Sequence, residues 1–147
     1  MSFDTYIYIE ANEFPEDAWK QACDEFGLVE NSSKKFYVDV HDSFGLKVSH
    51  SALAESHIHS NNYKWVISCN INNGTDVRSC WSLFSFPYYC MSYMSGVKFH
   101  EPRKDQWVSS LVDLEALAKE YLLGFSTIHK LENLGLLNDK DEIVLCR

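Results

Sequence analysis

The sequence predicts an α+β fold, in which a mainly antiparallel sheet of five or six strands carries an N-terminal helix and a C-terminal helical pair. Three observations lead to this prediction. A strand-like run, TYIYIE, precedes an amphipathic helical segment near the start of the chain. Short runs rich in aromatic and β-branched residues fill the middle, and helical periodicity returns in the last third. The 147 residues, 46% of them hydrophobic, predict a single domain spanning 1–147.

The first strand is predicted over Thr5–Glu10. One of its faces carries Tyr6 and Tyr8 and the other carries Ile7 and Ile9, so both faces are apolar and a central strand covered on both sides is expected. A helix follows, with Pro15 suited to its first position and Gly27 to its C-cap. One apolar stripe runs along this helix, formed by Ala18, Trp19, Ala22, Cys23 and Phe26. The opposite face is mostly acidic.

The middle of the chain predicts short strands joined by turns. The expected strands are Lys35–Val40, Leu46–Ser49, Tyr63–Ile71, Val77–Phe86, Tyr88–Met94 and Val97–His100. The Asn73-Gly74 pair predicts a tight hairpin between the third and fourth of these, and Pro87 predicts the end of the fourth. A polar, mobile loop is expected up to Asn62.

The last third predicts helices. Ser110 is placed to cap a helix whose stripe of leucines ends near Gly124. A shorter helix is expected over Thr127–Asn133, and Glu142–Cys146 predicts a closing strand.

Charge is the most informative feature for function. The chain carries 13 Lys and Arg against 21 Asp and Glu, a formal net charge of −8. Lys20 is the one cation in the first 30 residues, which hold the carboxylates Asp4, Glu10, Glu13, Glu16, Asp17, Asp24, Glu25 and Glu30. An acidic field repels phosphate, so no nucleic acid and no anionic membrane is expected as a partner. It favours a basic protein, although a role in solubility alone is the alternative.

Cysteine usage and the N-terminus indicate the compartment. Five cysteines form no CxxC pair, and the opening residues carry no basic and apolar signal pattern. Reduced thiols in a cytoplasmic protein are therefore predicted. No apolar run reaches the length of a membrane helix.

Catalytic motifs are weak. The sequence lacks GxSxG, GxxxxGK[ST] and GxGxxG. His57 and His59 would share one face of a strand and, with His41, form an alternative metal site for a small metal-dependent hydrolase. Cys90 with His100 is a further pair on paper, but nothing in the sequence brings the two together. No catalytic residue and no cofactor is predicted.

Aromatic residues cluster between Trp81 and Tyr93. Trp81, Phe84 and Phe86 are expected in the core. Tyr88, Tyr89 and Tyr93, after the strand-breaking proline, are expected to be partly exposed, as tyrosines at protein interfaces are.

The opening SFDTYIYIEANEFPEDAWKQACDEFG, with the size and the charge of the chain, resembles small acidic bacterial immunity proteins. The resemblance covers roughly the first 40 residues, and no binding residue is carried over from it. It implies a non-enzymatic inhibitor that neutralises a cognate toxin by occlusion. From the residues themselves, the predicted contacts with a basic partner are Glu13, Glu16, Asp17, Asp24, Glu25, Tyr88 and Tyr89. A structural adaptor or scaffold protein is a further alternative.

Overall fold

The computed structural model describes residues 3–31, 36–40, 45–53, 63–72 and 76–147. Its strands are β1 (Phe3–Ile9), β2 (Leu28–Glu30), β3 (Tyr37–Asp39), β4 (Lys47–Ala52), β5 (Trp65–Ile71), β6 (Val97–Glu101) and β7 (Gln106–Val108). Its helices are α1 (Glu16–Phe26), α2 (Val77–Tyr93), α3 (Leu111–Phe125) and α4 (Ile128–Asn133). The predicted α+β class is confirmed.

The seven strands form one sheet in the order β2-β3-β4-β5-β1-β6-β7, and every neighbouring pair is antiparallel. β1 lies between β5 and β6, as expected for a central strand. Five of the predicted strands are present, as β1, β3, β4, β5 and β6, and the three-residue strands β2 and β7 were not predicted. Such short runs carry too few residues to show an alternating pattern.

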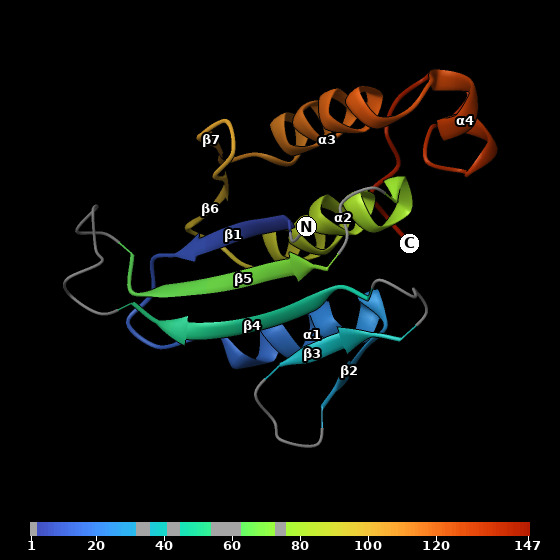
Figure 1. Cartoon of the computed structure of the whole chain (residues 1–147). Coiled ribbons are helices and arrows are strands. Elements are labelled where there is room, and N and C mark those ends of the chain that lie inside the picture. Colours follow the sequence, from blue (N-terminus) through green and yellow to red (C-terminus); the bar gives the residue numbers. More distant parts are fainter. Residues whose placement is uncertain (1–2, 32–35, 41–44, 54–62, 73–75) are drawn as a thin grey trace.

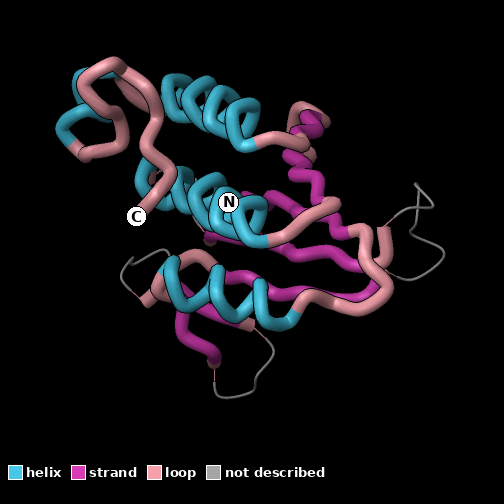
Figure 2. The backbone as a smooth tube through the Cα atoms, turned by 180° about the vertical axis from the view of Figure 1, so that it is seen from behind, coloured by secondary structure: helices cyan, strands magenta, loops and turns pink. Residues whose placement is uncertain are grey.

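The helices cover one face of the sheet. In Figure 1 the strands lie in front of α1 and α2, and in Figure 2, from behind, the two helices lie side by side before the sheet. The third helix, α3, packs on the side of α2 away from α1. On β1 the residues facing the helices, such as Ile7 and Ile9, are buried, whereas Tyr6 and Tyr8 are half-buried. The prediction that β1 is covered on both sides is therefore wrong.

The largest correction concerns residues 77–93, which form an α-helix and not the two predicted strands. Asp76 caps this helix, because its carboxylate accepts the backbone N–H of Arg78 at 2.8 Å and of Ser79 at 3.4 Å. Most of its residues are buried all round, between the sheet, α1 and α3. A helix without a solvent face has no amphipathic period, which is why the apolar run was interpreted as strand.

Pro87 lies inside α2 and has no N–H to donate to the carbonyl of Leu83, four residues earlier. The hydroxyl of Thr5, fully buried on β1, donates to that carbonyl at 3.1 Å. The sheet therefore supplies the hydrogen bond that the proline removes from the helix.

Thr5→Val is expected to lower the free energy of unfolding by about 1–3 kcal/mol, because the side-chain shape is kept while the Leu83 carbonyl loses its donor in the core. Chemical denaturation measures this loss. Thr5→Ser, which keeps the hydroxyl, is the control and should lose less. In a Pro87→Ala background residue 87 regains its N–H, so Thr5→Val should lower the free energy of unfolding by less than it does in the natural sequence. Equal losses in both backgrounds would contradict the assignment.

The remaining elements near the C-terminus follow the prediction, with one exception. Ser110 caps α3 and Thr127 caps α4, each by accepting a backbone N–H three residues on. The segment 142–146 does not join the sheet. Its isolated bridge links Ile143 to Leu137, and its backbone is held against α2.

The segment 143–147 is held by one row of side chains on α2. Trp81 Nε1 donates to the Val144 carbonyl at 2.7 Å, and Ser85 Oγ donates to the Leu145 carbonyl. These residues, with Tyr89, are spaced four apart on α2, so they share one helix face. Because side chains of α2 supply hydrogen bonds to the backbone of this segment, it needs no neighbouring strand, which explains why the apolar run 142–146 lies outside the sheet.

Candidate functional site

The carboxylates predicted to contact a partner lie on α1 and in the bend that precedes it. We call this set, Glu13, Glu16, Asp17, Asp24 and Glu25, the acidic face. All five are exposed. The opposite side of α1 is buried against the sheet and α2, because Trp19, Ala22, Cys23 and Phe26 form the predicted apolar stripe. Gly27 ends the helix in the left-handed conformation, with φ of 94°, as predicted for its C-cap.

The acidic face is little neutralised by the rest of the described chain. Among the described residues its one ion pair joins Glu16 Oε1 to His50 Nε2 at 3.8 Å, and no Lys or Arg pairs with it. Lys20 is the single cation on the helix. The carboxylate field of this face is thus directed at solvent, where it can attract a cationic surface.

Tyr93, at the end of α2, joins this face. Its hydroxyl donates to Glu25 Oε2, and this hydrogen bond raises the pKa of the Tyr93 phenol to about 12. The phenol is therefore protonated at neutral pH, and it holds the Glu25 carboxylate beside a half-buried aromatic ring. Tyr93 is half-buried, as the expected partial exposure requires, although it was not among the predicted partner contacts.

Tyr88 and Tyr89 occupy different environments. Tyr88 is half-buried, as expected. Tyr89 is 9% exposed, so the expectation that it lies on the surface is wrong. Its ring packs edge-on against Phe26 at 5.9 Å, and its hydroxyl oxygen accepts the backbone N–H of Arg147 at 2.7 Å. In a helix, unlike a strand, two adjacent residues point about 100° apart, and Tyr89 falls on the side that holds the segment 143–147.

An aromatic cluster lies beside the acidic face, on the covered side of the sheet. The His50 ring stacks on Phe14 with centroids 3.7 Å apart, and Trp19 packs edge-on against both rings. Burial lowers the pKa of His50, although Glu16 acts in the opposite direction. His50 is therefore mainly neutral at neutral pH and does little to offset the charge of Glu16.

The three histidines of the alternative metal site, His41, His57 and His59, lie outside the described residues. Within the described ranges, no three His, Cys, Asp or Glu side chains are grouped so that they could hold a metal ion. The hydrolase alternative remains a prediction.

The sequence also raised Cys90 with His100 as a nucleophile and base. Cys90 is fully buried in α2, and burial raises the pKa of its thiol well above the ordinary value. His100 lies on the uncovered face of the sheet, since its cross-strand neighbour is Tyr6. The sheet separates the two groups, so they form no catalytic pair.

The buried cysteines share this environment. Burial raises the pKa of Cys80 to about 11 and that of Cys69 to about 12. Neutral thiols in the core behave as small hydrophobic side chains.

The uncovered face of the sheet carries a surface that the sequence analysis missed. We call it the aromatic strip, and it consists of Tyr6, Tyr8, Tyr63, His100 and Trp107. Tyr8 is at its centre, with ring centroids 5.8 Å from Tyr63 and 5.3 Å from Trp107. His100 stacks on Trp107 at 4.1 Å.

Asp105 orders the end of the aromatic strip. Its Oδ1 lies 2.9 Å from His100 Nε2 and accepts Trp107 Nε1–H at 3.2 Å. Its backbone has a φ of 52°, which is uncommon for a residue other than glycine. Trp107 is 49% exposed, so the strip presents an aromatic surface to solvent. The alternation of Tyr6 and Tyr8 with Ile7 and Ile9 was the available signal, but it was interpreted as burial of both faces.

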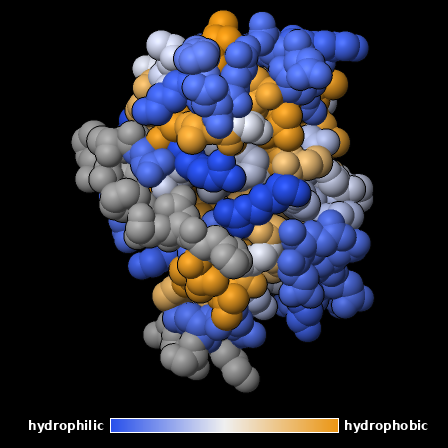
Figure 3. All heavy atoms as spheres, turned by 90° about the vertical axis from the view of Figure 1, so that its right-hand side faces the viewer, coloured by the Kyte–Doolittle hydropathy of each residue, from blue (hydrophilic) through white to orange (hydrophobic). Residues whose placement is uncertain are grey.

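Surface hydropathy is otherwise mixed. On the side of the molecule in Figure 3, hydrophobic side chains form separate areas between hydrophilic ones. No helix in the described part of the chain has the length and apolar character needed to cross a membrane. No protein-family model, curated protein or solved structure matches this chain.

Proposed function

We propose that this protein is a non-enzymatic, cytoplasmic inhibitor that binds a basic protein, and most concretely an immunity protein that neutralises a cognate bacterial toxin by covering a basic surface or active site. The observation that carries the proposal is the acidic face. Five exposed carboxylates lie on and beside one helix, without Lys or Arg partners among the described residues.

The acidic face would act mainly on the rate of encounter. Exposed carboxylates on one surface attract a basic partner over distances of about a Debye length, and salt weakens this attraction. Neutral side chains nearby would then provide the close contacts. Tyr88 and Tyr93 are half-buried at the same end of α2, and Tyr93 already contacts Glu25. Tyrosines supply contact area at low entropic cost.

Tyr89 has a different part in this proposal. Because its ring is buried against Phe26 and its hydroxyl holds Arg147, it supports the surface and does not contact the partner.

The partner is identified by capturing the tagged protein from lysate of its source organism, with bound proteins released by salt. Association kinetics are then measured with that partner. Asp17→Lys combined with Asp24→Lys is expected to slow association at low salt by roughly tenfold or more and to flatten its salt dependence. Both side chains are exposed and make no hydrogen bond or ion pair with other described residues.

Asp139→Lys combined with Glu142→Lys is the control, because it changes the net charge equally at an exposed turn outside α1. It also removes one exposed hydrogen bond, from Asn138 Nδ2 to the Glu142 carboxylate. If the two double variants slow association equally, net charge and not the acidic face is responsible. Unchanged kinetics in both, or a captured partner that is acidic, would contradict the proposal.

The aromatic strip is the second surface that could contact a protein partner, because exposed Trp and Tyr side chains are enriched at interfaces. It lies on the other side of the sheet from α1. Trp107→Ala distinguishes the two surfaces in the same assay. If the acidic face makes the contact, this variant leaves both association and dissociation rates unchanged.

A further inference from the structure

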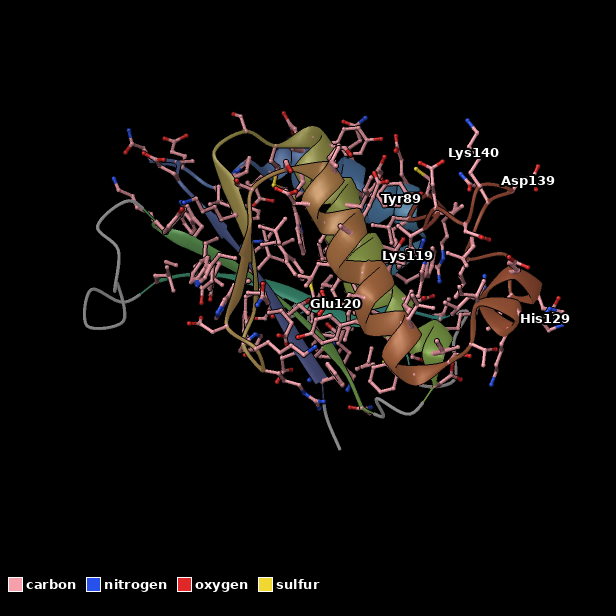
Figure 4. The ribbon with its side chains drawn as sticks, turned by 90° about the horizontal axis from the view of Figure 1, so that it is seen from above. Tyr89, Lys119, Glu120, His129, Asp139 and Lys140 are labelled. Atoms are coloured by element: carbon pink, nitrogen blue, oxygen red, sulfur yellow. The ribbon has the colours of Figure 1, made fainter. Side chains whose placement is uncertain are left out.

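A pocket of about 240 Å³ lies between the β6–β7 turn and α3. The turn contributes Arg103 and Lys104, and α3 contributes Glu120, Tyr121 and residues 124–125. Figure 4 shows Glu120 on the side of α3 that faces the strands, while Lys119 is on the other side. Phe3 of β1 completes the lining.

The turn that carries the two cations is held by a buried carboxylate. The Glu101 carboxylate is fully buried and accepts the backbone N–H groups of Arg103 and Lys104, each at 2.8 Å. The Tyr121 hydroxyl also donates to it. Burial and this hydrogen bond raise the pKa of Tyr121, so its phenol is protonated. Glu101 therefore fixes the backbone conformation of the turn, and this conformation places the side chains of Arg103 and Lys104 at the pocket.

The two cations differ in their contacts with carboxylates. Lys104 Nζ lies 3.6 Å from Glu120 Oε1 and 4.7 Å from the centre of the Tyr121 ring. The Arg103 guanidinium lies over the Phe3 ring, 3.3 Å from its centre, and no carboxylate among the described residues pairs with it. Stacking occupies the flat face of a guanidinium and leaves the N–H groups at its edge able to bind an anion in bidentate fashion.

The rest of the lining is apolar. Phe3 and Phe125 meet edge-on with centroids 6.0 Å apart, and Phe125 is 43% exposed. Gly124 adds no side chain, and a Cβ built on it would have no atom within 4 Å. The space beside the two phenylalanines is thus open to an aromatic or short apolar group.

We propose that this pocket binds a small aromatic monocarboxylate. Lys104 is paired with Glu120, so Arg103 is the lining cation that no described carboxylate pairs with, and one carboxylate suits its single guanidinium. The carboxylate pairs with the edge of Arg103, and the ring packs against the exposed side of Phe125, in the open space beside Gly124. A cavity of about 150 Å³ lined by apolar side chains holds benzene in another protein, so the space here suffices for a ring with its carboxylate.

Phenylacetate is the probe, and NMR titration of the full chain is the measurement. We expect saturable binding with a Kd on the order of a millimolar or below, in keeping with the size of the ligand. Phenylacetamide, which has the same shape without the charge, should bind at least about tenfold more weakly, and inorganic phosphate likewise. Equal binding of either compound, or no saturable shift with phenylacetate, would overturn the proposal.

Two variants test the pocket itself. Arg103→Gln should weaken phenylacetate binding by at least about tenfold, while Lys98→Gln, an equal change of charge at an exposed position of β6, should leave it unchanged. Gly124→Met fills the open space from α3 and should abolish binding without loss of thermal stability, since methionine favours a helix more than glycine does. Binding that survives both Arg103→Gln and Gly124→Met would place phenylacetate elsewhere.

Discussion

Phe86→Ala is expected to lower the free energy of unfolding by about 3–5 kcal/mol, the range for removing a large aromatic side chain from a packed core. Phe86 is fully buried in α2, and its ring packs edge-on against Trp19 at 5.7 Å and Phe26 at 5.5 Å. Both of those rings belong to α1. The side chain therefore joins the two helices that cover the sheet, and its loss leaves a cavity at their contact.

Denaturant unfolding followed by circular dichroism measures this loss. Two substitutions provide controls. Phe86→Leu keeps much of the volume and should cost about 1–2 kcal/mol. Phe125→Ala removes the same atoms from a ring that is 43% exposed, so it should cost far less than Phe86→Ala. A loss below about 1 kcal/mol in Phe86→Ala would show that α1 and α2 do not depend on this contact.

The elements that could be predicted are those whose pattern is local. α1 has an apolar stripe, acids in its first turn and a glycine at its end, and all three signals agree with a helix lying half in solvent. The position of the acidic face follows from the same pattern. For this reason the exposure of Glu16, Asp17, Asp24 and Glu25 could be predicted without knowledge of the fold, whereas Glu13 precedes the helix and is not part of this pattern.

α2 could not be predicted in the same way because its environment is set by the rest of the chain. Apart from Arg78, its residues are apolar, aromatic or serine, and most of these have modest helix propensity. Tertiary contacts compensate, through Thr5 at the Leu83 carbonyl and through hydrogen bonds from Trp81 and Ser85 to the segment 143–147. The local signal that was available, Asp76 as an N-cap, was outweighed by the Asn-Gly turn signal just before it.

The aromatic strip was missed for a different reason. Tyr6 and Tyr8 alternate with Ile7 and Ile9, so both faces of β1 are apolar in the sequence, and cover on both sides was expected. Once α2 packs beside α1 on a single face, the other face is left with Tyr6, Tyr8, His100 and Trp107. The aromatic strip is thus a consequence of topology and not of any motif.

The second large effect is expected at Arg147, which connects three elements. Its guanidinium donates to the Phe26 carbonyl at the end of α1 at 2.7 Å and to Asp39 Oδ2 at 2.5 Å, and it lies over the Phe26 ring at 4.1 Å. The Asp39 side chain is 0% exposed, whereas that of Arg147 is 22% exposed. A buried carboxylate depends on a nearby cation far more than an exposed one does.

Arg147→Met keeps the length of the side chain and removes its charge. We expect it to lower the free energy of unfolding by about 2–4 kcal/mol, somewhat less than for a completely buried pair because water reaches the guanidinium. Asp39→Asn removes the carboxylate charge instead. In the double variant no buried charge is left without its cation, so it should be less destabilised than the sum of the single variants by roughly 1 kcal/mol or more. Additive losses in this double-mutant cycle would show that Arg147 acts through the Phe26 carbonyl and ring, and that its contact with Asp39 adds nothing to stability.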